Sequence, residues 1–181
     1  MLCVLGQTIL SRVMEQQEAI VEYYMSRLGD NIEETIQEAI RDPQLFVFCE
    51  LLEAVEKLNS IWVGRLRTMA FGVIGESAPS WMNKDVLHKF RKLSLLTYVN
   101  VHGWSKLSLD HTCAYLHASC QLELIQLLLG MKPLMEVRID ERSGLWNVVD
   151  MHVFRDVDPR SVPALQEKLE RFIDRIDQLV L

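Results

Sequence analysis

The spacing of apolar residues switches from a helical period to a period of two over residues 134–153 of the 181-residue chain, and this switch constrains the fold more than any other feature. From residue 8 to about residue 131, apolar residues recur every three or four positions, which predicts amphipathic helices. Over 134–139 and 145–153 they alternate with polar residues at a period of two. Turn-forming residues and a glycine lie between these two segments, so the sequence predicts a β-hairpin within a mostly helical chain.

Capping residues divide the first part of the chain into short predicted helices. Asp30 or Asn31 is expected to cap the second helix. Asp42 and Pro43 predict the start of a third helix, with Asp42 as the N-cap and Pro43 in the first turn, where its missing N–H costs nothing. The turn-forming residues over 75–83 then predict an internal boundary.

The second part of the chain has the element order of a winged helix. A helix over 86–98 is followed by a brief strand over 107–109, helices over 112–117 and 121–131, and the hairpin. Basic residues on the helix over 86–98 and just before it are expected to face solvent: Lys84, Lys89, Arg91 and Lys92.

The last predicted helix begins between residues 158 and 161, and its apolar residues step alternately by four and three, as in a coiled-coil seam. For its first half, packing against the chain's own winged helix is as well supported as packing against a partner; from Phe172 onward we expect a partner helix. The strand over 145–153 is expected to form a sheet edge that pairs with another chain. The predicted partner-binding residues are Leu169, Phe172, Ile173, Ile176, Leu179, Val180, Trp146, Val148 and Asp150.

Charge and composition exclude several classes of protein. The chain has 19 Lys and Arg against 25 Asp and Glu, a net charge of −6, which repels nucleic acid. The helix over 121–131, which would enter a DNA groove, contains Glu123 and no basic residue. No apolar stretch reaches the length of a membrane span. We therefore expect neither a nucleic-acid nor a membrane partner, and the four scattered cysteines indicate an intracellular chain with reduced thiols.

Motifs that carry catalysis are missing from the sequence. It contains no H-x-H or H-E-x-x-H metal motif, no phosphate-binding loop and no nucleophile elbow, so we expect a non-enzyme with no catalytic residues and no cofactor. Cys113 and His117 are one helical turn apart, as zinc ligands often are. Cys113 and Cys120 also fit an apolar stripe as small hydrophobic residues, which we favour, and no metal site is predicted.

Six short motifs follow one another along the predicted helices and the winged helix. They are Asp42-Pro-Gln-Leu-Phe-Val-Phe-Cys-Glu-Leu-Leu52, Ala70-Phe-Gly72, Lys92-Leu-Ser-Leu-Leu96, Leu122-Glu-Leu-Ile125, Ile139-Asp140 and Arg155-Asp-Val157. Helical repeats joined to a winged helix, with these motifs in this order, resemble the PCI domain family. The resemblance implies a mostly α fold with three parts: helical repeats of the right-handed superhelix type over 1–83, a linker helix and a winged helix with a small β-sheet over 84–158, and a C-terminal bundle helix over 159–181.

Within this family the sequence is most similar to subunits of the COP9 signalosome. The resemblance implies a non-catalytic scaffold that assembles with other PCI-domain subunits and helical-bundle partners in the cytoplasm and nucleus. The assembly removes the modifier Nedd8 from cullins through a different subunit. A PCI subunit of translation initiation factor three or of the proteasome lid is the alternative, and a nucleic-acid-binding winged helix is less favoured.

Overall fold

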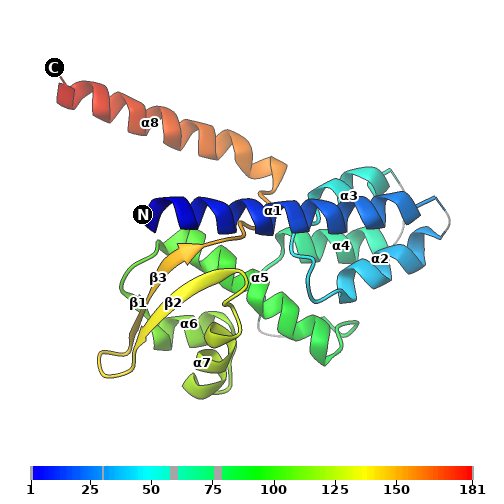
Figure 1. Cartoon of the computed structure of the whole chain (residues 1–181), viewed down its shortest axis with the longest axis horizontal. Coiled ribbons are helices and arrows are strands. Elements are labelled where there is room, and N and C mark those ends of the chain that lie inside the picture. Colours follow the sequence, from blue (N-terminus) through cyan, green and yellow to red (C-terminus); the bar gives the residue numbers. More distant parts are fainter. Residues whose placement is uncertain (1, 30, 58–60, 76–78, 181) are drawn as a thin grey trace.

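The structure is a computed structural model that describes residues 2–29, 31–57, 61–75 and 79–180 (Figure 1). It is mostly helical with a small antiparallel sheet of three strands in the order β1-β3-β2. The helices are α1 (Leu2–Arg27), α2 (Ile32–Arg41), α3 (Cys49–Val55), α4 (Ile61–Phe71), α5 (Lys84–His102), α6 (Leu109–Tyr115), α7 (Gln121–Leu129) and α8 (Val162–Val180), and the strands are β1 (Leu107–Ser108), β2 (Met135–Asp140) and β3 (Leu145–Met151). This layout is compatible with the predicted helical part followed by a winged helix.

The long helix α1 packs against α2 and α3, and α2 folds back along it (Figure 1). The predicted cap of α2 is confirmed, because the Asn31 side chain accepts a hydrogen bond from the backbone N–H of Glu34. The face of α2 that meets the rest of the molecule is apolar and buried, and includes Ile36, Ala39 and Ile40. The amphipathic spacing of this segment therefore has the role that the sequence predicts.

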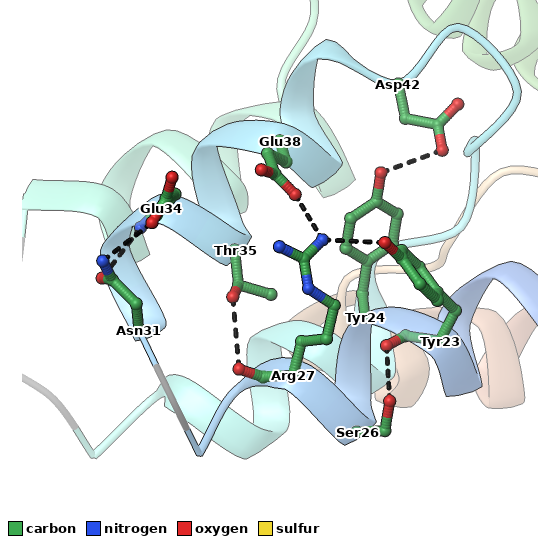
Figure 2. Close-up of polar contacts among 9 residues, drawn as sticks. All are labelled: Tyr23, Tyr24, Ser26, Arg27, Asn31, Glu34, Thr35, Glu38 and Asp42. Atoms are coloured by element: carbon green, nitrogen blue, oxygen red, sulfur yellow. Dashed lines mark hydrogen bonds and ion pairs between the residues drawn. The ribbon is translucent and has the colours of Figure 1, made fainter.

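Polar side chains also join α1 to α2 (Figure 2). The hydroxyl of Tyr24 donates a hydrogen bond to Asp42 at 3.0 Å, at the end of α2. The guanidinium of Arg27 donates to Glu38 and to the hydroxyl of Tyr23. These contacts hold the two helices side by side at their polar margin, where the apolar core ends.

The segment 42–48 is not the helix start that the sequence predicts. Asp42 instead ends α2, and α3 begins only at Cys49. The side-chain amide of Gln17, on α1, donates to the backbone carbonyl of Gln44 at 2.7 Å and accepts from the backbone N–H of Phe46 at 2.9 Å. Because a side chain from 27 or more residues away satisfies this backbone, the segment needs no helical hydrogen bonds.

Lys89 on α5 faces the core, with 5% of its surface exposed. Its ammonium donates hydrogen bonds to the carbonyl oxygens of Ala39, Ile40 and Asp42 at 2.5 to 3.1 Å and lies 4.7 Å from the ring centre of Phe48. The prediction that Lys89 faces solvent is therefore wrong: the lysine pairs with carbonyls at the C-terminal end of α2. Burial lowers the pKa of Lys89 to about 7.

The sheet shares one hydrophobic core with the helices. A single cluster of buried apolar side chains runs from Val21 on α1 to Val153 just after β3. Trp146 on β3 is fully buried, and its indole N–H donates to the hydroxyl of Thr112 on α6 at 3.0 Å. Residues 76–78 of the predicted boundary over 75–83 lie outside the described residues, and the buried residues of the segments on its two sides belong to the same core.

The predicted hairpin is confirmed, but the prediction that residues 145–153 form a sheet edge is wrong for the first half of the strand. β3 lies between β2 and β1, with Leu107 opposite Trp146 and Ser108 opposite Leu145. The turn of the hairpin contains Gly144 at φ +66°, a left-handed conformation that favours glycine. The outer strand along the hairpin is therefore β2.

Candidate functional site

α8 extends away from the rest of the molecule (Figure 1). Every side chain described between residues 161 and 176 is exposed to solvent. Folding back onto the winged helix, the alternative left open by the sequence for the first half of this helix, is therefore not what the structure shows. Over its described side chains, the 19-residue amphipathic helix stands free of the chain's own core.

One apolar stripe runs along α8. Leu165, Leu169, Phe172 and Ile176 follow one another at spacings of four, three and four residues, and Ile173 widens the stripe on one side. Between 43% and 59% of each of these side chains is exposed. Contiguous apolar surface of this kind marks interaction sites on soluble proteins. Two further predicted partner-binding residues have side chains outside the described part of the structure: Leu179 and Val180.

The opposite face of α8 is charged. Glu167 and Arg171 form an ion pair at 3.0 Å with spacing i,i+4, and both side chains are well exposed. Such a pair adds only a few tenths of a kcal/mol to helix stability. The polar face therefore stays hydrated, and the apolar stripe is the face that gains by being covered.

Arg155 holds the chain just before α8. Its guanidinium donates to the carbonyl oxygens of Met69 and Ala70 at 2.9 Å, to that of Leu93 at 3.3 Å, and to the hydroxyl of Thr97 at 2.7 Å. Met69 and Ala70 lie in the last turn of α4, whose carbonyls have no partner within the helix. Burial lowers the pKa of Arg155 to about 10, so the group remains charged at neutral pH.

Asp156 performs the matching role at a helix N-terminus. Its carboxylate accepts a hydrogen bond from the backbone N–H of Phe48 at 2.6 Å, at the start of α3, although 108 residues separate the two. Burial raises the pKa of Asp156 to about 6, against the opposing effect of hydrogen bonds from the backbone N–H groups of Phe48 and Cys49. A cation at the end of α4 and an anion at the start of α3 both suit the helix dipoles.

We call Arg155 and Asp156 the exit clamp, because they fix the backbone that leads from the sheet to α8. The resemblance motif contains both residues, but the sequence gives no indication of what they bind. The available signal is an adjacent pair of opposite charges inside the otherwise apolar stretch 153–157. Charged residues are rarely buried without partners, so this pair could have been predicted to cap helix ends.

The sheet residues predicted to bind partners are placed differently from α8. Trp146 is fully buried and Val148 is 7% exposed, so neither side chain is presented to another chain in this structure. Asp150 is half-buried, faces Glu136 across the strand pair, and lies 3.7 Å from the imidazole of His152. Asp150 is thus the one of these three that lies near the surface.

The histidine and cysteine residues over 102–120 do not assemble into a metal centre. In the part of the chain that the structure describes, no group of three or more His, Cys, Asp or Glu side chains is placed to hold a metal ion. Cys113 is half-buried and its thiol donates to the carbonyl oxygen of Ala118. Among the described helices, none is both long and apolar enough to cross a bilayer.

Comparisons with known proteins leave the family open. Neither the protein-family models nor the curated proteins compared with the chain match it.

Proposed function

We propose that the protein is a non-catalytic scaffold subunit of a multi-subunit complex, in which α8 packs into a bundle with helices of other subunits. The observation that carries this proposal is the exposed apolar stripe of α8, with Leu169, Phe172 and Ile176 open to solvent on a helix whose described side chains cover no core of the chain. Burying such a stripe is favourable by about 25 cal/mol per Å² of apolar surface.

The width of the stripe favours a bundle over a two-stranded coiled coil. Leu165, Leu169, Phe172 and Ile176 make a seam of alternating four and three, and Ile173 adds a third column beside it. A two-stranded coiled coil needs only the seam, whereas a helix packed between several neighbours needs the wider face. The additional column therefore indicates more than one partner helix.

Basic residues beside the stripe disfavour pairing between two copies. On a heptad pattern with Leu169 and Ile176 at the a positions, Lys168 and Arg175 occupy the flanking g positions. In an antiparallel pair of identical helices these like charges would meet across the interface. A partner helix with acidic flanking residues suits this surface better than a second copy does.

The resemblance to the PCI domain family supplies the choice of complex. The sequence is most similar to subunit 7 of the COP9 signalosome, so we propose that the chain contributes to subunit assembly for cullin deneddylation, in the cytoplasm and nucleus. PCI subunits of translation initiation factor three and of the proteasome lid are the alternatives. A role in duplex binding is less favoured, because α7 exposes Leu122 and Leu129 in place of basic side chains.

Co-expression with PCI-domain subunits of the COP9 signalosome tests the proposal. We expect Phe172→Asp together with Ile176→Asp to abolish co-elution in size-exclusion chromatography, because covering each side chain is worth about 1.5–3 kcal/mol. The helical circular dichroism of the isolated chain should stay unchanged, since both side chains are already exposed.

The matched control introduces the same residue type on the polar face. Ala164→Asp with Arg171→Asp should leave co-elution intact, because both positions lie away from the stripe. Retained assembly of the Phe172/Ile176 variant, or equal loss in both variants, would contradict the bundle. Cleavage of a Nedd8–cullin conjugate by the purified chain alone, abolished by a chelator, would contradict the non-catalytic role.

A further inference from the structure

A groove of about 540 Å³ lies between the end of α2, the first half of α5 and the start of α7. It is separate from α8 and from the exit clamp, so its role is independent of the proposed scaffold function. Most of its charged lining residues are basic, in a protein whose net charge is −6. The basic residues are Arg41, Lys84, His88, Lys89, Arg91 and Lys92, and the acidic ones are Asp85 and Glu123.

Two of the basic groups already have partners. Lys89 donates to backbone carbonyls at the end of α2, and Arg91 forms an ion pair with Glu123. Arg41, Lys84 and Lys92 form no ion pair or side-chain hydrogen bond with any other described residue. These three cations are therefore available to a ligand.

Burial and neighbouring charges act on the basic groups that line the groove. Burial lowers the pKa of Lys92. Burial, followed by the charges of Lys92 and Arg91, lowers the pKa of His88. Lys84 occupies the first turn of α5, where the helix dipole is also positive. A concave surface on which charges of one sign predominate attracts ligands of the opposite sign.

We propose that this groove binds an acidic segment of a partner polypeptide, whose carboxylates pair with Arg41, Lys84 and Lys92. Exposed Pro43 and half-buried Leu87 also line it, and they offer apolar contact to a side chain between the carboxylates. A nucleic-acid strand suits the groove less well. The net negative charge of the protein would repel the phosphates along the strand, and only a few free cations could pair with them. The carboxylates of a short peptide would instead all lie within the groove.

Fluorescence anisotropy of a fluorescein-labelled peptide, Glu-Glu-Leu-Glu-Glu-Phe-Glu-Glu, titrated with the full chain tests the proposal. At about 50 mM salt, where screening is modest, we expect saturable binding. Arg41→Glu together with Lys84→Glu should raise the Kd at least about tenfold by replacing attraction with repulsion. Circular dichroism melting checks that the variant is folded, and Arg41→Gln with Lys84→Gln replaces it if it is not, with a smaller rise in Kd expected.

A second charge-reversal variant separates the groove from net charge. Lys106→Glu with Arg142→Glu changes the overall charge equally on exposed residues that do not line the groove, and should leave the Kd nearly unchanged. Absence of binding by the unmodified chain, an equal loss in both charge-reversal variants, or equal binding of a lysine-rich peptide of the same length would overturn the proposal. Tighter binding of a duplex oligonucleotide through Arg41 and Lys84 would also overturn it.

Discussion

The exit clamp predicts a large loss of stability from one substitution, Arg155→Met. Methionine keeps the apolar stem but removes all four hydrogen bonds of the guanidinium. The buried carbonyls of Met69 and Ala70 then lose a partner, at about 1–3 kcal/mol each. Relief from burying a charge, which the lowered pKa of Arg155 reflects, offsets part of this cost. We expect a net loss of about 3 kcal/mol in the free energy of unfolding.

Urea denaturation followed by circular dichroism measures this loss, and a thermal melt should show a decrease in Tm of about 6–12 °C for a chain of this size. Arg160→Met is the matched control, since Arg160 lies five residues further on and its side chain is exposed beside Asp158. That variant should stay within about 0.5 kcal/mol of the wild type. If Arg155→Met were no more destabilising than Arg160→Met, the reasoning about buried helix-end carbonyls would be refuted.

Two further predictions concern pH. Because burial raises the pKa of Asp156 to about 6, ionisation of this group lowers the stability of the wild type as the pH rises from about 4 to about 6. The free energy of unfolding of Asp156→Asn should therefore increase relative to wild type over this window, by on the order of 3 kcal/mol in urea titrations, and a constant difference would contradict this. Burial lowers the pKa of Lys89 to about 7, so the wild type should gain stability relative to Lys89→Met between about pH 7 and pH 10. If the difference in the free energy of unfolding between wild type and Lys89→Met stayed constant or fell as the pH rose, Lys89 would not be buried as described.

Elements specified by neighbouring residues could be predicted from the sequence. Asn31 caps α2 through a residue three positions away, and the β2–β3 hairpin follows from alternation and a glycine at the turn. The stripe of α8 is likewise a local pattern, and the exposure of Phe172, Ile173 and Ile176 agrees with the expectation that the chain's own core does not cover this part of the helix. In each case the determining interaction lies within a few residues along the chain.

Features specified by distant residues could not be predicted in this way. Pro43 suits the start of a helix, but Gln17 on α1 and Lys89 on α5 bind the backbone of this segment and hold it outside any helix. The spacing of Lys89 along α5 is that of a solvent-facing residue. Burial of its side chain is favourable only because carbonyl groups at the end of α2 accept its hydrogen bonds. β1 has two residues, so nothing in its own sequence shows that it pairs with β3 and covers the strand expected at the edge.

The outer strand β2 has a consequence for how a partner-free copy of this chain behaves. Its register with β3 is irregular between Glu136 and Val137, and Glu136 and Arg138 on it are exposed. Irregular, charged border strands resist stacking into extended sheets or fibrils. A copy without its partners is therefore protected against edge-to-edge growth of β-sheet at β2, and the apolar stripe of α8 is the surface that still needs a partner to cover it.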